Sequence, residues 1–289
     1  MSSKEIDDVS GTETTGHEWD GIKELNTPLP RWWLWTFYAT IVWAVGYMVL
    51  YPAIPLVTGS TKGVLGYSSR ADVAREIAEA KTGMAGLLDK VGSMALEDIR
   101  KDPDLFQFAV AGGRSAFSVN CVQCHGSGAA GGKGYPNLND DEWLWGGSLD
   151  AIHTTLVHGI RFEGDDDTRV SDMPAFGRDG VLDTAQIDDV AEHVLALSGQ
   201  EHDQAAAERG TAIFEENCAA CHGAQGEGIA DVGAPALSNA ISLYGGDKAS
   251  IVETVTNARR GVMPAWGRRL DDATLKQLAV YVHSLGGGQ

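Results

Sequence analysis

The longest apolar run in the chain extends from Trp32 to Tyr51, 20 residues without a charge. At a rise of about 1.5 Å per residue, a helix of this length spans the hydrocarbon core of a bilayer, about 30 Å. Aromatic side chains stand at both ends of the run, as in the interfacial belts of membrane helices. A buried core helix would show a more polar face, and a cleaved signal peptide would follow a short basic start. The pattern therefore predicts a tail over residues 1–31 and a membrane-spanning helix over 32–54.

A weaker helical period follows this anchor, with apolar residues at helical spacing over residues 69–98. Gly83 and Gly92 are expected to interrupt this helix. We interpret residues 55–102 as a helical linker, and a flexible tether is the alternative. The pair Asp102-Pro103 is typical of a helix start, because Asp caps free N–H groups and Pro fits the first turn.

The rest of the chain contains one sequence pattern twice. Six residues of the first copy recur 97 positions later in the second. They are Gly113, Phe117, Asn120, Cys121, Cys124 and His125, which recur as Gly210, Phe214, Asn217, Cys218, Cys221 and His222. Each copy closes with an amphipathic helical pattern, over 185–198 and 273–285, that can bury one face. The repeat predicts a mainly α fold with two tandem domains of the same kind, over 103–200 and 203–289.

Composition and charge narrow the class of function. The chain has 40 acidic and 22 basic residues and a net charge of −18, so the phosphate backbone of a nucleic acid would be repelled. The four cysteines fall in two closely spaced pairs, which leaves none for a disulfide framework. A segment found only in the first copy lies near the acidic run Asp165–Asp167, which we expect to be a solvated loop rather than a cation site.

Both cysteine pairs belong to a Cys-x-x-Cys-His motif. This is the attachment signature of haem c, because two thiols one helical turn apart can form thioether bonds to one porphyrin, and the adjacent His can coordinate the iron. A zinc site would need further ligands in the same repeat, and a thioredoxin-like pair would need a βαβ setting. The motifs therefore predict two covalently bound haem c groups. Their expected attachment and iron-ligand residues are Cys121, Cys124, His125, Cys218, Cys221 and His222.

The sixth iron ligand is predicted from two matched methionines. Met173 and Met263 are the only methionines after Met94, and each precedes Pro-Ala-aromatic-Gly. A lone Met is usually a core residue, but two in matching loops indicate a role of their own, and a thioether favours reduced iron. We therefore expect His/Met coordination of both haems. Ligation within each repeat is the simpler arrangement, and exchange of the methionines between the repeats stays open.

Further repeated residues are expected to support these sites. The carbonyls of Pro136 and Pro235 are candidates to accept a hydrogen bond from the ligand histidines. Gly113 and Gly210 would let the first helix of each repeat cross the last one closely. The candidate partners for haem propionates are Trp145, Tyr244, Arg161, Arg259 and Arg260.

No other histidine is expected to bind iron. His193 and His283 are 90 positions apart, as the two methionines are, but the closing helices align better at an offset of 88. That alignment places His193 opposite Tyr281, so the match of the two histidines is a coincidence. The histidines without a counterpart in the other repeat are His17, His153, His158 and His202.

The repeats resemble two tandem class I cytochrome c domains, and the whole chain resembles the dihaem subunit III of cbb3-type cytochrome c oxidases, the FixP/CcoP family. The resemblance rests on the tail segments His17–Ile22 and Asn26–Trp33, on Tyr51–Ala53 after the apolar run, and on the two haem motifs. It covers most of residues 16–288. The tail joined to the haem motifs makes it specific.

This resemblance implies a respiratory role in a bacterial inner membrane. The subunit would accept electrons from a donor cytochrome c and pass them through its haems to a monohaem cytochrome c subunit. From there they would reach the haem–copper subunit, which reduces oxygen and pumps protons. The haem domains would lie in the periplasm and the tail in the cytoplasm. This chain would not itself carry out the oxygen chemistry.

Three other functions compete with this interpretation. A membrane-tethered dihaem shuttle that serves several partners would need no dedicated contact within the membrane. A dihaem peroxidase would need one iron with an open sixth position, and the matched Met loops argue against that. A haem-based sensor would normally carry a signalling domain, for which little of the chain remains.

Overall fold

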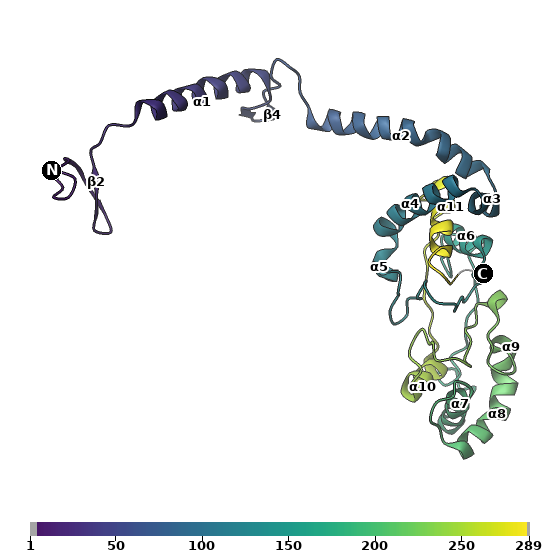
Figure 1. Ribbon diagram of the computed structural model, residues 1–289. Helices are drawn as coiled ribbons and strands as arrows, with labels where there is room; N and C mark the ends of the chain where they lie inside the picture. The colour runs from purple at the N-terminus through teal and green to yellow at the C-terminus, as the bar shows by residue number, and fades with distance from the viewer. Residues whose placement is uncertain (1–4, 288–289) are drawn as a thin grey trace. The chain divides into compact units, whose positions relative to one another are not determined.

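The computed structural model describes residues 5–287, and the chain is mainly helical, as the sequence predicts (Figure 1). It divides into two compact units that meet at Gly83. We describe each unit by itself.

The first unit begins with a hairpin that the sequence analysis did not predict. Strands β1 (Thr14–Trp19) and β2 (Ile22–Leu25) pair antiparallel around a turn at Asp20 and Gly21. Both turn residues have positive φ, 48° and 82°. An Asp-Gly pair favours this turn, because Gly and Asp adopt left-handed backbone more readily than other residues.

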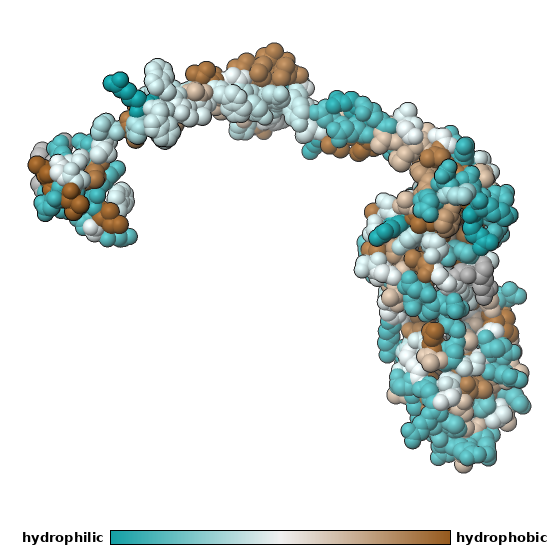
Figure 2. Space-filling view, in the orientation of Figure 1, coloured by the Kyte–Doolittle hydropathy of each residue, from teal (hydrophilic) through white to brown (hydrophobic). Residues whose placement is uncertain are grey.

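Helix α1 (Arg31–Leu50) matches the predicted membrane span, although it ends four residues earlier than expected. It is long and apolar enough to cross a membrane, and none of its side chains is buried against the rest of the protein. Figure 2 shows its surface as pale to brown along most of its length. A helix with apolar residues on all sides and no protein neighbour needs lipid or another apolar partner to cover it. A short hairpin, β3 (Pro55–Leu56) with β4 (Gly59–Ser60), follows.

The predicted linker is helical, but its break points were predicted wrongly. Helix α2 (Ser69–Ser93) runs without interruption through Gly83 and Gly92, and a shorter helix, α3 (Leu96–Lys101), follows it. A Gly inside a helix costs only about 1 kcal/mol, which a helix of 25 residues can absorb.

The second unit contains the two repeats. The first repeat forms α4 (Pro103–Asn120), α5 (Val122–His125), α6 (Leu149–His158) and α7 (Thr184–Leu197). The second forms α8 (Gln204–Asn217), α9 (Ala219–His222), the 3-10 turn η1 (Ala230–Val232), α10 (Lys248–Asn257) and α11 (Asp272–His283). The predicted helix start is confirmed: the Asp102 carboxylate accepts hydrogen bonds from the N–H groups of Asp104 and Leu105, at 3.0 and 3.1 Å.

The helices pack into two modules that do not follow the sequence repeats. In module 1, α11 of the second repeat packs against α4, α6 and α3 of the first part of the unit, and in module 2, α7 of the first repeat packs against α8 and α10 (Figure 1). The buried residues divide in the same way. The core of module 1 joins Phe117 and Leu156 to Leu278, and the core of module 2 joins Val190 to Phe214 and Val255. The boundaries 103–200 and 203–289 thus describe the sequence repeat, and the prediction that each repeat encloses its own core is wrong.

The expected close helix crossings are present, but between repeats. A Cβ atom at Gly113 on α4 would collide with the Gln277 carbonyl on α11, and one at Gly210 on α8 would collide with the Asp189 carbonyl on α7. Gly is needed at both positions because the two backbones touch there.

Candidate haem sites

Each Cys-x-x-Cys-His motif folds as one helical turn after a long helix. Cys121 caps α4, and the N–H of His125 donates to its carbonyl at 2.9 Å; the N–H of His222 donates to Cys218 in the same way at 3.0 Å. The second thiols, on Cys124 and Cys221, are exposed. Two sulfurs and an imidazole of each motif therefore lie together beside the core of a module.

The inner thiol of each pair is poorly suited to hold a metal as a thiolate. Burial, together with the neighbouring Cys124, raises the pKa of the Cys121 thiol to about 11. Burial, together with Cys221, raises that of Cys218 to about 11 as well. Zinc and redox-active cysteines depend on the thiolate form, which burial disfavours at these two positions.

The histidine of each motif is fixed by a backbone carbonyl, as predicted. His125 Nδ1 lies 3.1 Å from the Pro136 carbonyl oxygen, and His222 Nδ1 lies 3.0 Å from that of Pro235. A carbonyl can only accept, so Nδ1 carries the proton and Nε2 keeps its lone pair for a metal. Burial also lowers the pKa of both histidines, which favours the neutral imidazole that ligates iron.

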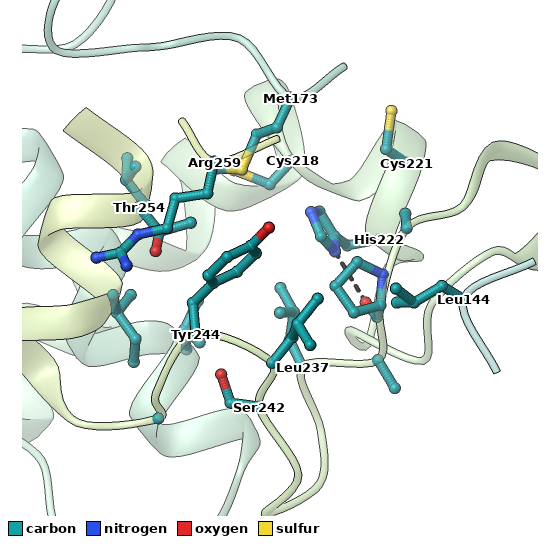
Figure 3. Close-up of a pocket in the computed structure, with 18 of the residues that line it drawn as sticks. Leu144, Met173, Cys218, Cys221, His222, Leu237, Ser242, Tyr244, Thr254 and Arg259 are labelled. Atoms are coloured by element: carbon teal, nitrogen blue, oxygen red, sulfur yellow. Dashed lines mark hydrogen bonds between the residues drawn. The ribbon is translucent and has the colours of Figure 1, made fainter. Parts of the chain in front are cut away.

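A cavity of about 220 Å³ opens in module 2 (Figure 3). Cys218, Cys221 and His222 of the second repeat line it, and so does Met173 of the first repeat. Figure 3 shows Met173 close to Cys218, and His222 joined to its carbonyl partner. Apolar side chains such as Phe176 form much of the remaining wall.

Module 1 contains the reciprocal cavity, of about 90 Å³. Cys121 and His125 of the first repeat line it together with Met263 of the second. Leu278 and Val282 of α11 complete the apolar wall. The arrangement left open by the sequence is therefore the one that the structure adopts: each methionine lies in the cavity of the other repeat's motif.

Backbone hydrogen bonds hold both Met loops in the exchanged position. Met263 pairs with Ile160 at the end of α6 through two bonds, of 2.9 and 3.0 Å. The N–H of Gly267 donates to the Val157 carbonyl at 3.0 Å. In module 2, the N–H of Arg178 donates to the Thr256 carbonyl at the end of α10, at 2.9 Å.

The two cavities share one wall. Leu144 lines both of them. A Cβ atom at Gly233 would overlap the ring of Trp145, and one at Gly134 would meet the ring of Tyr244 at 3.3 Å. The aromatic residue of each repeat therefore packs on a glycine of the other, which brings the two cavities side by side.

The candidate propionate partners divide unequally between the cavities. Arg161, Arg259 and Tyr244 line the cavity of module 2, and Trp145 lines that of module 1. Arg259 lies over the Tyr244 ring, 5.3 Å from its centroid. Arg260 instead pairs with Asp172 at 3.1 Å.

Sequence reasoning missed Arg169. Its guanidinium lies over the Trp145 ring, 5.4 Å from the centroid, and its buried Nε has no hydrogen-bond partner among the described residues. Arg169 stands four residues before Met173, as Arg259 stands four residues before Met263, so the offset of 90 that relates the two methionines also relates these arginines. Each lies over the matching aromatic ring of its repeat, Trp145 or Tyr244.

The acidic run is exposed at Asp166 and Asp167, as predicted, but not at Asp165. Asp165 has a side chain only 13% exposed and lies 3.1 Å from Nδ1 of His158. The bond to His158 lowers the pKa of this carboxyl. Its carboxylate also accepts from the N–H of Asp167 at 3.0 Å, so the pair fixes the loop after α6.

The remaining histidines agree with the sequence analysis. Among the described residues, His125 and His222 are the histidines that line the two cavities. The alignment of His193 with Tyr281 is confirmed, because each lies against the crossing glycine of its module and beside a Phe, at ring centroid distances of 5.1 and 5.5 Å.

The residues present fit haem c in both cavities. Each cavity is lined by an imidazole with Nε2 available, a methionine and a largely apolar wall; both thiols of the motif line the cavity of module 2, and Cys121 lines that of module 1, with Cys124 three residues further on the same turn. This is the donor set of a six-coordinate c-type haem. Arg161 and Arg259 line the cavity of module 2, and Arg169 lies over Trp145 of the module 1 cavity with an Nε unpartnered among the described residues, so these cations are candidate partners for carboxylates.

Comparison with known proteins identifies the family of the chain. Residues 11–58 match the family described as the N-terminal domain of cytochrome oxidase-cbb3, FixP. Residues 108–194 and 205–282 each match the family of cbb3-type cytochrome c oxidase subunit III. The chain thus carries two tandem cytochrome c repeats in its sequence.

Relatives that are named as CcoP or FixP subunits of cbb3-type cytochrome c oxidases are similar to this chain over nearly its whole length. The chain is 57% identical over 276 residues to the cbb3-type cytochrome c oxidase subunit CcoP of Cereibacter sphaeroides, which covers 96% of this chain and 95% of that protein. It is 55% identical to subunit FixPc of Rhizobium leguminosarum bv. viciae and 54% identical to CcoP of Azospirillum brasilense, with full coverage of both chains in each case. The anchor, the two exchanged cavities and these matches together show that the chain belongs to the CcoP/FixP family, subunit III of the cbb3-type cytochrome c oxidases.

Proposed function

We propose that this subunit accepts electrons from a donor cytochrome c and passes them through two covalently bound haem c groups to the monohaem subunit and then the haem–copper subunit of its oxidase. When bound, the haem groups supply the one-electron redox chemistry. The observation that carries the proposal is the shared wall: two cavities, each lined by the motif His and Cys and by a Met, meet at Leu144. Two haem sites that adjoin in one chain are suited to electron transfer between them.

The chain's own residues would have distinct roles. Cys121 and Cys124, and likewise Cys218 and Cys221, would attach the two haems as thioethers. His125 and His222 would ligate iron through Nε2, while Pro136 and Pro235 hold the proton on Nδ1. This hydrogen bond fixes the ring orientation and raises its basicity as a ligand.

Met173 and Met263 would be the sixth ligands, each to the haem of the other repeat. The two residues line the same cavities as the motifs with which they are paired here. A site closed by His and Met leaves no position for oxygen or peroxide, which supports electron transfer over a peroxidase function.

The proposed location is a bacterial inner membrane, with α1 spanning it and the modules in the periplasm. The support is the apolar, uncovered surface of α1 together with the family to which the chain belongs. The alternative is a tethered shuttle that serves several partners, for which α1 would be an anchor only.

Haem content tests the cofactor assignment. A pyridine haemochrome assay on the purified full chain should give two haem c per polypeptide, retained after acid–acetone extraction because thioethers are covalent. The double variant Cys218→Ala/Cys221→Ala should retain one. A single haem in the parent, or extractable haem, would contradict the assignment.

Removal of the anchor tests the route. A chain lacking residues 1–55, exported by a cleavable signal, should remain a dihaem protein that a donor cytochrome c reduces. Membranes of that strain should respire poorly with the same donor, because the tail and α1 would no longer dock to the oxidase. Full respiration would instead favour the shuttle.

A further inference from the structure

Arg161 touches both Met loops at once. Its Nε donates to the Gly261 carbonyl at 2.9 Å, and its Nη1 donates to the Ser171 carbonyl at 2.7 Å. Gly261 stands two residues before Met263, and Ser171 stands two residues before Met173. The two carbonyls therefore occupy equivalent positions in the two repeats.

The contact of Arg161 with both loops is significant because the Met loops are exchanged between the repeats. The loop of Met263 closes the cavity of module 1, and the loop of Met173 closes that of module 2. One guanidinium thus joins the two segments that close different cavities. A planar group with several fixed N–H donors can hold two carbonyls in this way, whereas the single ammonium of Lys is a point donor.

The backbone around Arg161 is arranged to aim this side chain. Arg161 has φ of 52°, in the left-handed region that a side chain other than Gly rarely adopts. Its N–H donates to the Arg169 carbonyl at 2.8 Å. Both the N–H and the carbonyl of the preceding residue, Ile160, are bonded to the backbone of Met263. Such a conformation persists only where its surroundings enforce it.

The two Met loops depend on Arg161 to different degrees. Met263 has its own backbone pairing with Ile160, so Arg161 is a second restraint there. Over residues 5–287, the backbone of Met173 makes no corresponding pair, and the bond from Arg161 restrains the backbone two residues before it, at Ser171. Both loops should loosen without Arg161, and the Met173 loop more.

We propose that Arg161 is a positioning residue that holds both axial Met loops closed and so couples Met retention in one module to that in the other. The proposal rests on the assignment of Met173 and Met263 as iron ligands. It concerns geometry and not charge alone, because two hydrogen bonds from one fork restrain two loops.

Imidazole titration of the oxidised full-length chain in detergent tests the proposal, since imidazole binds only where Met leaves the iron. The charge-transfer absorption of the Met–ferric haem bond and the two ring-current-shifted Met methyl resonances of the reduced protein report each ligand directly. In Arg161→Gln, imidazole affinity should rise at least about tenfold at both haems, as expected for loss of hydrogen bonds from a charged donor.

Two matched variants separate the effect of the double hydrogen bond from that of charge alone. Arg260→Gln removes an ion pair to Asp172 on the Met173 loop, and because Arg260 is 55% exposed it should change affinity less than about twofold. Arg161→Lys keeps the charge but reaches one carbonyl, so one haem should change and the other should resemble the parent. This variant also carries the test if Arg161→Gln fails to accumulate.

The outcomes are distinguishable. If the parent lacks the two Met signals, the ligand assignment itself is wrong. If the parent has both and Arg161→Gln changes neither affinity, or only one, the coupling by Arg161 is overturned. If Arg161→Lys binds imidazole at both haems with the affinity of the parent, the proposal is overturned as well, because the two-pronged guanidinium would then be unnecessary.

Discussion

Modules 1 and 2 share the same helix crossing but differ in the side chains of their interiors. In both, a glycine of the first helix meets the backbone of the exchanged closing helix, Gly113 against Gln277 and Gly210 against Asp189. At the position where module 1 has buried Val280, module 2 has Glu192, only 6% exposed. The Glu192 carboxylate accepts from Lys248 at 2.7 Å and from the N–H of Asp203 at 2.8 Å.

The cavities differ in charge as well. The cavity of module 2 is lined by two arginines, Arg161 and Arg259, and by Asp172, whereas the cavity of module 1 is lined by Glu142 and, within residues 5–287, by no arginine. The comparison teaches that the repeat conserves the backbone crossing and the donor set, while the remaining interior adapts to each site.

Separation of the repeats should have the largest effect. A chain ending at residue 202 lacks α11, whose Leu275, Leu278, Val280 and Val282 are buried in module 1. Four such side chains contribute on the order of 6–12 kcal/mol, comparable to the stability of a small domain. We expect the helices of the first repeat to unfold in this chain, with a loss of helical circular dichroism larger than the missing residues account for, and Met ligation to be absent.

Co-expression of residues 203–289 as a separate exported chain is the control for this truncation. The two pieces should associate and restore both modules, because each supplies the helix that the other lacks. A stable, Met-ligated first repeat on its own would contradict the exchange.

Ligand replacement should distinguish the modules next. In the Cys218→Ala/Cys221→Ala background, only the haem of module 1 remains. Met263→His should then lower its reduction potential by a few tenths of a volt, within the ~0.8 V range that axial ligands span. Met173→His in the same background should leave the redox titration unchanged. The reverse result would mean ligation within each repeat.

Substitution of the crossing glycines should lower the free energy of unfolding to a similar extent in both modules. Gly113→Ala or Gly210→Ala forces two backbones apart and should lower the free energy of unfolding by about 3 kcal/mol. Gly128→Ala is the matched control, because a Cβ atom there meets nothing within 4 Å. Thermal unfolding followed by circular dichroism measures the difference, and equal melting of all three variants would contradict the close crossing.

The smallest expected effect is specific to module 2 and depends on pH. The bond from Lys248, with that from the Asp203 N–H, holds the pKa of Glu192 below its usual value. Stabilisation by this carboxylate is therefore present above the pKa of the unfolded chain and is lost as pH falls through the folded value. Glu192→Gln should destabilise the protein by about 2 kcal/mol at neutral pH and by less in acid.

Glu253→Gln, on the exposed side of α10, is the control for Glu192→Gln. Denaturant unfolding at several pH values provides the measurement. A constant difference between parent and Glu192→Gln from neutral to acid pH would show that the charge of Glu192 is not involved.

Much of each site could be predicted from the sequence because its chemistry is local. Cys121, Cys124 and His125 lie on one turn whatever the tertiary structure, and the same holds for the second motif. The Pro136 and Pro235 carbonyls were also found, since they follow their motifs closely. The double contact of Arg161 was not, because it depends on how remote segments meet. Arg169 was overlooked, although it matches Arg259 at the offset of the two methionines.

The sequence by itself determined the span of α1, the two motifs, the two Met loops and the two glycine crossings, since each follows from residue type and short-range spacing. It did not determine which closing helix packs on which first helix, because both repeats present equivalent surfaces. Only six residues separate Leu197 at the end of α7 from Gln204 at the start of α8. A connection this short makes consecutive helices neighbours, so α7 packs on α8, α11 is left to close module 1, and each methionine moves with its helix.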